Sequence, residues 1–152
     1  MKTIEEEIKQ KKFPNIYIKT DVNLLYTNGW LQTNMMRFFK QYGLSIQQYN
    51  VLRILRGQHP KPVMLNQITA RMIDKMSNAT RLVEKLKQKE LVTRELNEKS
   101  RRQVDICITD AGLTILSKID IEINAQLPPA HYANISIKEL EQLNFILDKI
   151  RN

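Results

Sequence analysis

The stretch "SNATRLVEKLKQKELVTREL" (residues 77–96), followed directly by "NEKSRRQVDICIT" (residues 97–109), decides the fold. Its first part has the period of an amphipathic helix, and Leu82, Val83 and Leu86 share one face. The other face carries polar and basic side chains, namely Asn78, Arg81, Lys85 and Lys89. Ser77 is the expected N-cap, because its hydroxyl can accept from a free backbone amide of the first turn. The pattern predicts a helix over residues 77–89 with a basic outer face.

A second short helix is predicted just upstream, within "NQITARM" (residues 66–72), with Asn66 as its N-cap candidate. Two short helices with a tight connection, the second of them basic, are typical of a helix-turn-helix. Downstream, residues 91–96 and 103–109 have strand composition. Between them we expect a hairpin tip that carries Arg101 and Arg102. The order of elements predicts a winged helix-turn-helix over residues 43–110.

Apolar helices are predicted on both sides of this region. Over residues 21–42 large apolar residues recur at helical spacings, which indicates a helix buried on more than one side, and Gly43 ends it. Residues 110–127 form another predicted helix, which stops before two prolines. Two capping boxes mark further helix starts: Ser45 with Gln48, and Ser136 with Glu139. The fold class is therefore mainly α with a small β-hairpin wing, and the helices of residues 1–42 and 111–152 have apolar faces without a partner in so short a chain.

Composition limits the function classes. The 152 residues carry a formal net charge of +8, and residues 43–110 hold 13 Lys and Arg against 7 Asp and Glu. This basic middle favours an anionic partner. The N-terminus lacks the apolar core of a signal peptide, and no apolar run is long enough to span a membrane, so we expect a cytoplasmic protein. His59 and His131 lie far apart without ligand spacing, so we assign no metal. The sequence shows no nucleophile–base grouping and no glycine-rich phosphate loop, so we assign no cofactor and no enzymatic activity.

The predicted second helix suits the major groove of DNA. Residues near its start would reach base edges. Arginine can contact guanine, asparagine can contact adenine, and the methyl groups of Ala79 and Thr80 can touch the thymine methyl. The backbone amides of residues 77–80 could face a phosphate. The alternative for any one of these residues is a solvated helix face, and the cluster followed by a basic hairpin favours DNA.

The two arginines of the predicted tip have two interpretations. A narrow minor groove has an enhanced negative potential that attracts an inserted arginine. Alternatively, Arg101 and Arg102 only keep an edge hairpin soluble. The adjacent helix-turn-helix favours the minor-groove interpretation.

At this point four blocks of the sequence resemble the MarR (multiple antibiotic resistance regulator) family: "LSIQQYNVLRIL", "SNATRLVEKLKQKELVTREL", "SRRQV" and "ITDAG". The resemblance covers residues 44–112, and the flanks match by layout only. It implies a homodimeric winged-helix regulator, expected to act as a repressor, that binds pseudo-palindromic double-stranded DNA. The terminal helices would then interlock with those of a second subunit and form a dimerisation lobe from residues 1–42 and 111–152.

Carried onto this sequence, the family's major-groove contacts fall on Ser77, Asn78, Thr80 and Arg81. The wing contacts fall on Arg102, with Arg101 and Lys99 beside it in a wing of residues 96–103, and backbone contacts are expected at Lys75 and Lys85. The sequence departs from the family at two positions. Ser100 replaces the aspartate that precedes the arginine pair and that orients the wing arginine by ion pairing in the family. Either Glu98 takes over this ion pair or the wing is looser. Glu90 replaces a glycine that follows the recognition helix in the family. Either Glu90 adopts a left-handed conformation or the helix ends differently.

An effector pocket is a further expectation from the resemblance, because some relatives bind small aromatic acids between the two lobes. Such a pocket for an aromatic or phenolic effector could be lined by Trp30, Met35, Tyr49 and Arg53, although core packing is the alternative for the apolar ones. Cys107 lies on a wing strand and is expected to be an inert, half-buried thiol. The alternative function is a winged-helix interaction module that docks its basic face on an acidic protein.

Overall fold

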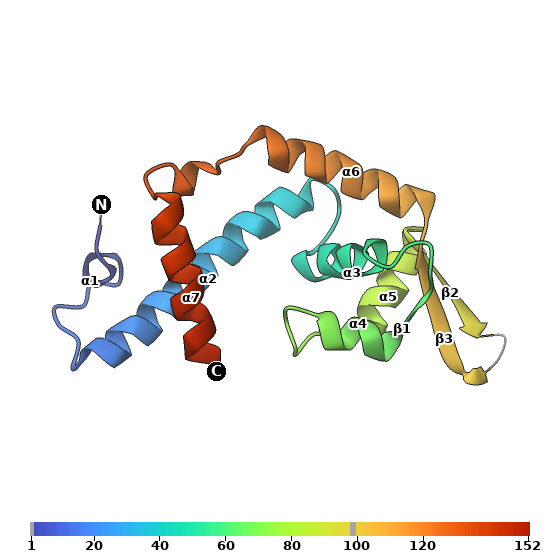
Figure 1. Cartoon of the computed structure of the whole chain (residues 1–152), viewed down its shortest axis with the longest axis horizontal. Coiled ribbons are helices and arrows are strands. Elements are labelled where there is room, and N and C mark those ends of the chain that lie inside the picture. Colours follow the sequence, from blue (N-terminus) through green and yellow to red (C-terminus); the bar gives the residue numbers. More distant parts are fainter. Residues whose placement is uncertain (1, 98–99) are drawn as a thin grey trace.

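The computed structural model describes residues 2–97 and 100–152, with backbone only at residues 97 and 100–103. The helices are α1 (Ile4–Glu7), α2 (Ile16–Lys40), α3 (Ile46–Arg56), α4 (Leu65–Arg71), α5 (Ala79–Gln88), α6 (Asp110–Ala125), the 3-10 helix η1 (Ala130–Tyr132) and α7 (Ile137–Arg151). The strands are β1 (Val63–Met64), β2 (Val92–Asn97) and β3 (Ser100–Ile108). At one end of the molecule α3, α4, α5 and the strands form a lobe, and α1, α2 and α7 extend at the other end (Figure 1).

The core lies in the first lobe, where α3, α4, α5 and the sheet converge. Its fully buried side chains include Leu52, Leu55, Ile68, Val83, Leu86 and Ile106. Helix α6 closes this core with Leu116 and Ile119, which are also fully buried. The apolar face predicted for residues 77–89 is thus the face that anchors α5, and its polar face is left outward. This arrangement confirms the predicted winged helix-turn-helix.

The sheet has the order β1-β3-β2, with both pairings antiparallel. Val63 pairs with Ile106, and Val92 pairs with Ile108. Strand β1 escapes sequence-based prediction because only two residues of it pair with β3. The prediction that Arg101 and Arg102 sit in a loop tip is wrong, since β3 already begins at Ser100 and their backbone belongs to the strand.

The predicted helix starts agree with the structure in part. The capping boxes at Ser45 and Ser136 are both present, and Gly43 has the left-handed φ of 65° expected after a helix. Asn66 is not an N-cap, because α4 begins one residue before it, at Leu65. There the side chain of Gln67 accepts from the amide of Met64 at 3.0 Å.

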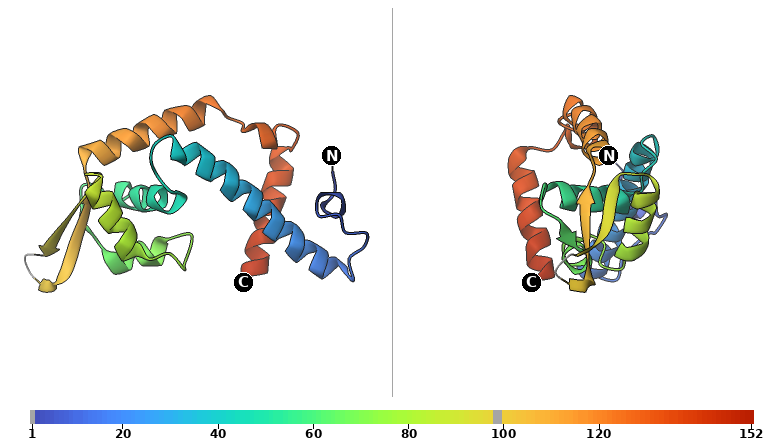
Figure 2. Two further views of the ribbon diagram at one scale, coloured as in Figure 1. Left: turned by 180° about the vertical axis from the view of Figure 1, so that it is seen from behind. Right: turned by 90° about the vertical axis from the view of Figure 1, so that its right-hand side faces the viewer.

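Helix α2 is longer and much more exposed than predicted. It begins at Ile16, where the side chain of Asn15 caps it, and only Phe39 among its residues is buried. Leu25 is 71% exposed, and Phe145 on α7 is 63% exposed. The terminal helices therefore present apolar side chains that the single chain does not cover. Helices α2 and α7 extend away from the lobe that holds the sheet (Figure 2).

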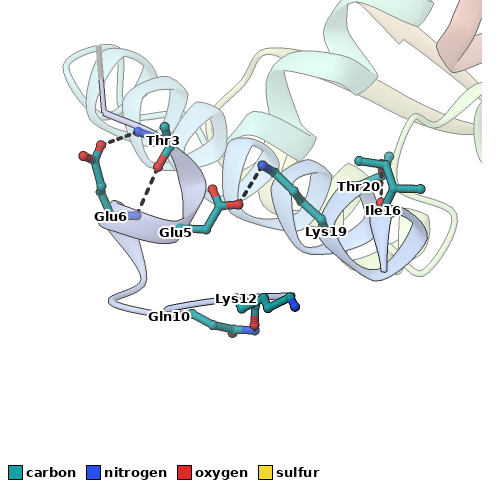
Figure 3. A network of polar contacts seen from close by, with 8 residues as sticks. All are labelled: Thr3, Glu5, Glu6, Gln10, Lys12, Ile16, Lys19 and Thr20. Atoms are coloured by element: carbon teal, nitrogen blue, oxygen red, sulfur yellow. Dashed lines mark hydrogen bonds and ion pairs between the residues drawn. The ribbon is translucent and has the colours of Figure 1, made fainter. Parts of the chain in front are cut away.

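The N-terminal segment lies against α2. Thr3 and Glu6 form a capping box at the start of α1, and Glu5 pairs with Lys19 of α2 at 2.7 Å (Figure 3). The hydroxyl of Tyr26 donates to Glu7 at 2.9 Å. Within residues 2–97 and 100–152, none of the helices combines the length and hydropathy that crossing a membrane requires.

Candidate nucleic-acid interface

Helix α5 presents the polar face predicted from its sequence. Ala79, Val83 and Leu86 are buried against the core, whereas Thr80, Arg81 and Lys85 are exposed on the outer side. Because the buried face holds the backbone of α5 in place, the Cα positions of its exposed residues are fixed. Helix α5 therefore presents the cations of Arg81 and Lys85 one turn apart in the same row, with the hydroxyl of Thr80 exposed beside them.

The start of α5 differs from the prediction. Asn78, not Ser77, is the N-cap, and its Oδ1 accepts from the amide of Arg81 at 3.0 Å. The Ser77 hydroxyl donates to Asp74 at 2.8 Å, and the Ser77 amide donates to the Asp74 carbonyl at 3.2 Å. The Ser77 amide is therefore already bonded within the protein and does not face a phosphate. The carboxamide oxygen of Asn78 is likewise engaged, which leaves its amide group as the part that can donate outward.

The turn before α5 is ordered by Asp74. Besides the Ser77 hydroxyl, this carboxylate accepts from the amide of Met76 at 3.0 Å. The hydrogen bond from Ser77, followed by that from Met76, holds the pKa of Asp74 below its ordinary value. Lys75 is exposed, and its Nζ donates to the carbonyl of Ala70 at 2.7 Å. To make the expected contact with the DNA backbone, the Lys75 side chain would have to leave the Ala70 carbonyl of α4.

The end of α5 is a Schellman motif. The amide of Leu91 donates to the Leu86 carbonyl at 3.0 Å, and the amide of Glu90 donates to the Lys87 carbonyl at 2.8 Å. Glu90 has a φ of 59°, so of the two alternatives for this position the left-handed conformation is correct. Lys89 does not belong to the outer face, because its Nζ donates to the Gly43 carbonyl and to Gln48.

The wing lies next to α5. Arg94 on β2 pairs with Glu84 on α5 at 3.4 Å, and both side chains are partly exposed. Between α4, α5 and the sheet there is a hollow of about 280 Å³, and Thr80, Arg94 and Asn66 contribute to its lining. Sequence reasoning missed Arg94, because pairing between a strand and a helix leaves no local pattern.

The residues predicted to act at the tip of the wing are described only in part by the structure. Lys99 and Glu98 lie outside them, so the proposed partner of the wing arginine is not described. Arg101 and Arg102 are placed by backbone alone, at the start of β3. Ser100 pairs with Asn97 across the hairpin, after an irregularity between Leu96 and Asn97.

The four expected effector residues lie in two groups. Tyr49 stacks on Phe39 with ring centroids 4.2 Å apart, and Arg53 donates to the Tyr49 hydroxyl at 3.0 Å. Trp30 instead makes an edge contact with His131, at 5.3 Å between centroids. Met35 lies on the same helix as Trp30 and is partly exposed.

Helix α6 is joined to the rest of the first lobe by polar contacts. Asp120 pairs with Arg56 at 2.6 Å and with Arg53 at 3.5 Å. Glu122 accepts from the hydroxyl of Tyr42 and from Gln41. These contacts connect α6 to the end of α2 and to α3, and so join the two regions of the chain.

Cys107 is half-buried on β3. Burial, and then the carboxylates of Asp105 and Glu95, raise the pKa of its thiol. A raised pKa lowers the thiolate fraction, in agreement with the expected inert thiol. In the described part of the chain no group of three or more His, Cys, Asp or Glu side chains could hold a metal ion.

Comparison with known proteins places this chain in a family. The MarR family model matches residues 44–104. The HTH-type transcriptional regulator MgrA of Staphylococcus aureus is 26% identical over 147 residues, covering 96% of this chain and 91% of MgrA. YkoM of Bacillus subtilis strain 168, an uncharacterized HTH-type transcriptional regulator, is 30% identical over 114 residues, covering 75% of this chain and 72% of YkoM.

A solved structure agrees with the fold. A mutant MarR from E. coli, crystallised in complex with operator DNA, superposes with a TM-score of 0.79 at 18% identity. The match covers 92% of this chain and 99% of that one. The relatives named above are transcriptional regulators, in agreement with the prediction that the chain is not an enzyme. With the family model on its helix-turn-helix and a 30% identical relative along most of its length, this chain belongs to the MarR family of winged-helix transcriptional regulators.

Proposed function

We propose that the protein is a sequence-specific regulator that binds double-stranded DNA as a homodimer on a pseudo-palindromic operator and represses transcription. Helix α5 enters the major groove, and the β2–β3 hairpin lies at the adjacent minor groove. Residues 43–110 form the DNA-binding region, and residues 1–42 and 111–152 form the dimerisation region.

The single observation that carries the proposal is the outer face of α5. Thr80, Arg81 and Lys85 are exposed on a helix whose other face is fully anchored. Arginine can donate two parallel hydrogen bonds to guanine O6 and N7, and the methyl group of threonine can contact thymine. Lys85 lies one turn further along, at a position suited to a phosphate. In the major groove Asn78 is proposed to contribute through its amide group and Ser77 through its hydroxyl oxygen, which can still accept a hydrogen bond. Lys75 is proposed to contact the DNA backbone.

The wing is proposed to contact the minor groove through Arg102, with Arg101 and Lys99 beside it. The support is topological, because β2 and β3 form a hairpin that extends from the lobe next to α5 (Figure 1). An arginine delivered into a narrow minor groove gains from its enhanced negative potential.

The homodimer is supported by the terminal helices. No residue of α7 is buried in the single chain, although Leu143, Phe145, Ile146 and Ile150 lie on it. Apolar surface of this extent at both ends of a chain indicates an interface. A two-fold dimer presents two copies of α5 to two half-sites, which explains why the operator would be pseudo-palindromic.

A small aromatic acid or phenol is the proposed effector class. Tyr49 and Arg53 supply a ring and a cation next to Asp120 of α6. Trp30 and Met35 would join them only in the dimer or after a movement of α2. A ligand at this junction would act on the contacts between α6 and α3, and so on the spacing of the two α5 helices.

The test measures binding to an inverted repeat upstream of the protein's own gene by fluorescence anisotropy, with a scrambled duplex of equal composition as control. We expect a clear preference for the repeat and an affinity that falls steeply with salt, because lysine and arginine contacts release counterions from DNA. Light scattering should give the mass of two chains. Equal affinity for the scrambled duplex at moderate salt would refute the sequence-specific claim.

A further inference from the structure

The connection between α4 and α5 exposes two large apolar side chains. In this turn, defined here as residues 72–78, Met76 is 93% exposed and Ile73 is 85% exposed. No other large apolar side chain described by the structure is as exposed as these two. Met72 at the start of the same turn is buried in the core. The exposure of Ile73 and Met76 is therefore confined to the part of the turn that leads into α5.

The backbone that carries these side chains is held in place. The amide of Ile73 donates to Oδ1 of Asn50 on α3 at 3.0 Å. The amide of Met76 donates to Oδ1 of Asp74, whose Oδ2 accepts from the Ser77 hydroxyl. Because the turn is fixed at both of its apolar residues, it presents them in defined positions at the start of α5. Two apolar side chains on a fixed backbone are therefore available for a contact at the start of α5.

The charges around the turn favour a nucleic acid as the occupant. Arg71, Lys75 and Arg81 lie within five residues of Ile73 or Met76 along the chain and are all exposed. The carboxylate of Asp74 is occupied by hydrogen bonds from within the turn. Basic side chains at these positions suit the phosphates of a nucleic acid. In the major groove the apolar group that a protein can contact is the 5-methyl group of thymine.

We propose that Met76 reads thymine, by packing its side chain on a thymine 5-methyl group next to the base pairs that α5 faces. Ile73 covers the adjoining sugar. The position fits, because residues at the start of a recognition helix reach base edges. This inference rests on the proposed function and adds a specificity-determining residue outside the helix itself.

The experiment uses the full chain and DNA selected by it. Random-sequence duplexes are selected for binding, and the tightest duplex is synthesised with single thymines replaced by deoxyuridine, which pairs identically and lacks the methyl group. At one thymine in each half-site we expect wild-type affinity to fall about fourfold, the value of one buried CH₂ group. Met76→Ala should bind the thymine and deoxyuridine duplexes equally, and Met76→Leu should restore the difference.

Arg81→Ala is the matched control, because it weakens binding while leaving the deoxyuridine effect in place. The thermal midpoint of Met76→Ala should equal that of the wild type, since the side chain is exposed. If Met76→Ala keeps the full deoxyuridine effect, the inference is overturned and the proposed function stands. If selection yields no preferred sequence, both fail. A protein that co-purifies with the wild type and not with Met76→Ala, while DNA binding is unchanged, would also overturn the inference.

Discussion

Lys89 at the end of α5 donates from Nζ to Oε1 of the buried Gln48 at the start of α3, at 3.1 Å. The same ammonium group donates to the carbonyl of Gly43, the residue in left-handed conformation after α2. Gln48 Oε1 also accepts from the amide of Ser45. One cation thus joins the end of the proposed recognition helix to the point where the long terminal helix enters the DNA-binding region.

Replacing Lys89 with methionine should loosen this junction. The carbonyl of Gly43 loses a charged donor, and the side chain retains its apolar stem. We expect the free energy of unfolding to fall by about 1 kcal/mol, since hydrogen bonds to exposed charged groups contribute little more than that. Urea unfolding measures the change.

Lys87→Met is the control for Lys89→Met, because it removes the same charge from a neighbouring exposed position. DNA affinity should fall more in Lys89→Met than in Lys87→Met, because α5 loses its attachment as well as a charge. Equal stability and equal affinity of the two variants would show that the junction has no role in positioning α5.

Arg81 and Lys85 should differ in how they contribute to DNA binding. Arg81→Ala removes a bidentate base contact, so it should relax specificity at one position and cost about 1–3 kcal/mol at the preferred sequence. Lys85→Ala removes a phosphate contact, so it should weaken binding to all sequences similarly and reduce the salt slope by about one. Salt titrations on the preferred and scrambled duplexes separate the two effects. An exchange of these two patterns would reverse the assignment.

Glu90→Gly should stabilise the protein. A side-chain-bearing residue in the left-handed region costs roughly 1–2 kcal/mol, and glycine avoids this at an entropic cost of about 0.4–1 kcal/mol in the unfolded chain. We therefore expect a net gain of about 0.5–1 kcal/mol in urea unfolding. Glu90→Ala removes the same carboxylate and keeps the strain, so its stability should stay close to that of the wild type. A gain in both variants would assign the effect to charge.

Local patterns predicted the winged helix-turn-helix lobe well. The face of α5 that carries Val83 and Leu86 is set by helical period, and Gly43 and the capping box at Ser45 act within a few residues. The N-cap of α5 is Asn78 rather than Ser77, and sequence alone does not separate the two because both residue types favour this position. Asp74 decides between them by engaging the Ser77 hydroxyl, and this contact across a turn has no sequence signature.

Contacts between residues far apart in the sequence could not be predicted from local patterns. The pair of Arg94 with Glu84 and the bond from Lys89 to Gln48 join residues whose separation follows no helical or strand period. The predicted burial of α2 on several sides is wrong for the single chain, because periodicity identifies an apolar face and not the molecule that covers it. The family resemblance groups Trp30 with Tyr49 in one effector pocket, whereas the fold sets Trp30 against His131.

Gly112→Ala should be strongly destabilising. A Cβ atom at Gly112 would overlap the carbonyl oxygen of Leu91 and lie 2.7 Å from Cγ1 of Ile108. The Leu91 carbonyl also accepts from the amide of Thr109, so the backbone there cannot move without losing that bond. Overpacking of this kind typically costs about 1–3 kcal/mol. Thermal unfolding measures it, with Gly57→Ala as control, because a Cβ at Gly57 meets ordinary contacts of 3.5 Å and more.

Cys107 should react slowly with alkylating reagents. Burial on β3, together with the carboxylates of Asp105 and Glu95, raises the pKa of its thiol, so the folded protein holds less thiolate than an unfolded chain at the same pH. The rate of iodoacetamide alkylation at neutral pH should therefore lie below that of free cysteine. It should increase on raising the pH beyond the ordinary thiol pKa, and on unfolding in urea. Cys107→Ser should leave DNA affinity unchanged under reducing and oxidising conditions alike. Fast alkylation at neutral pH, or DNA binding that responds to peroxide only when Cys107 is present, would make this thiol a sensor instead.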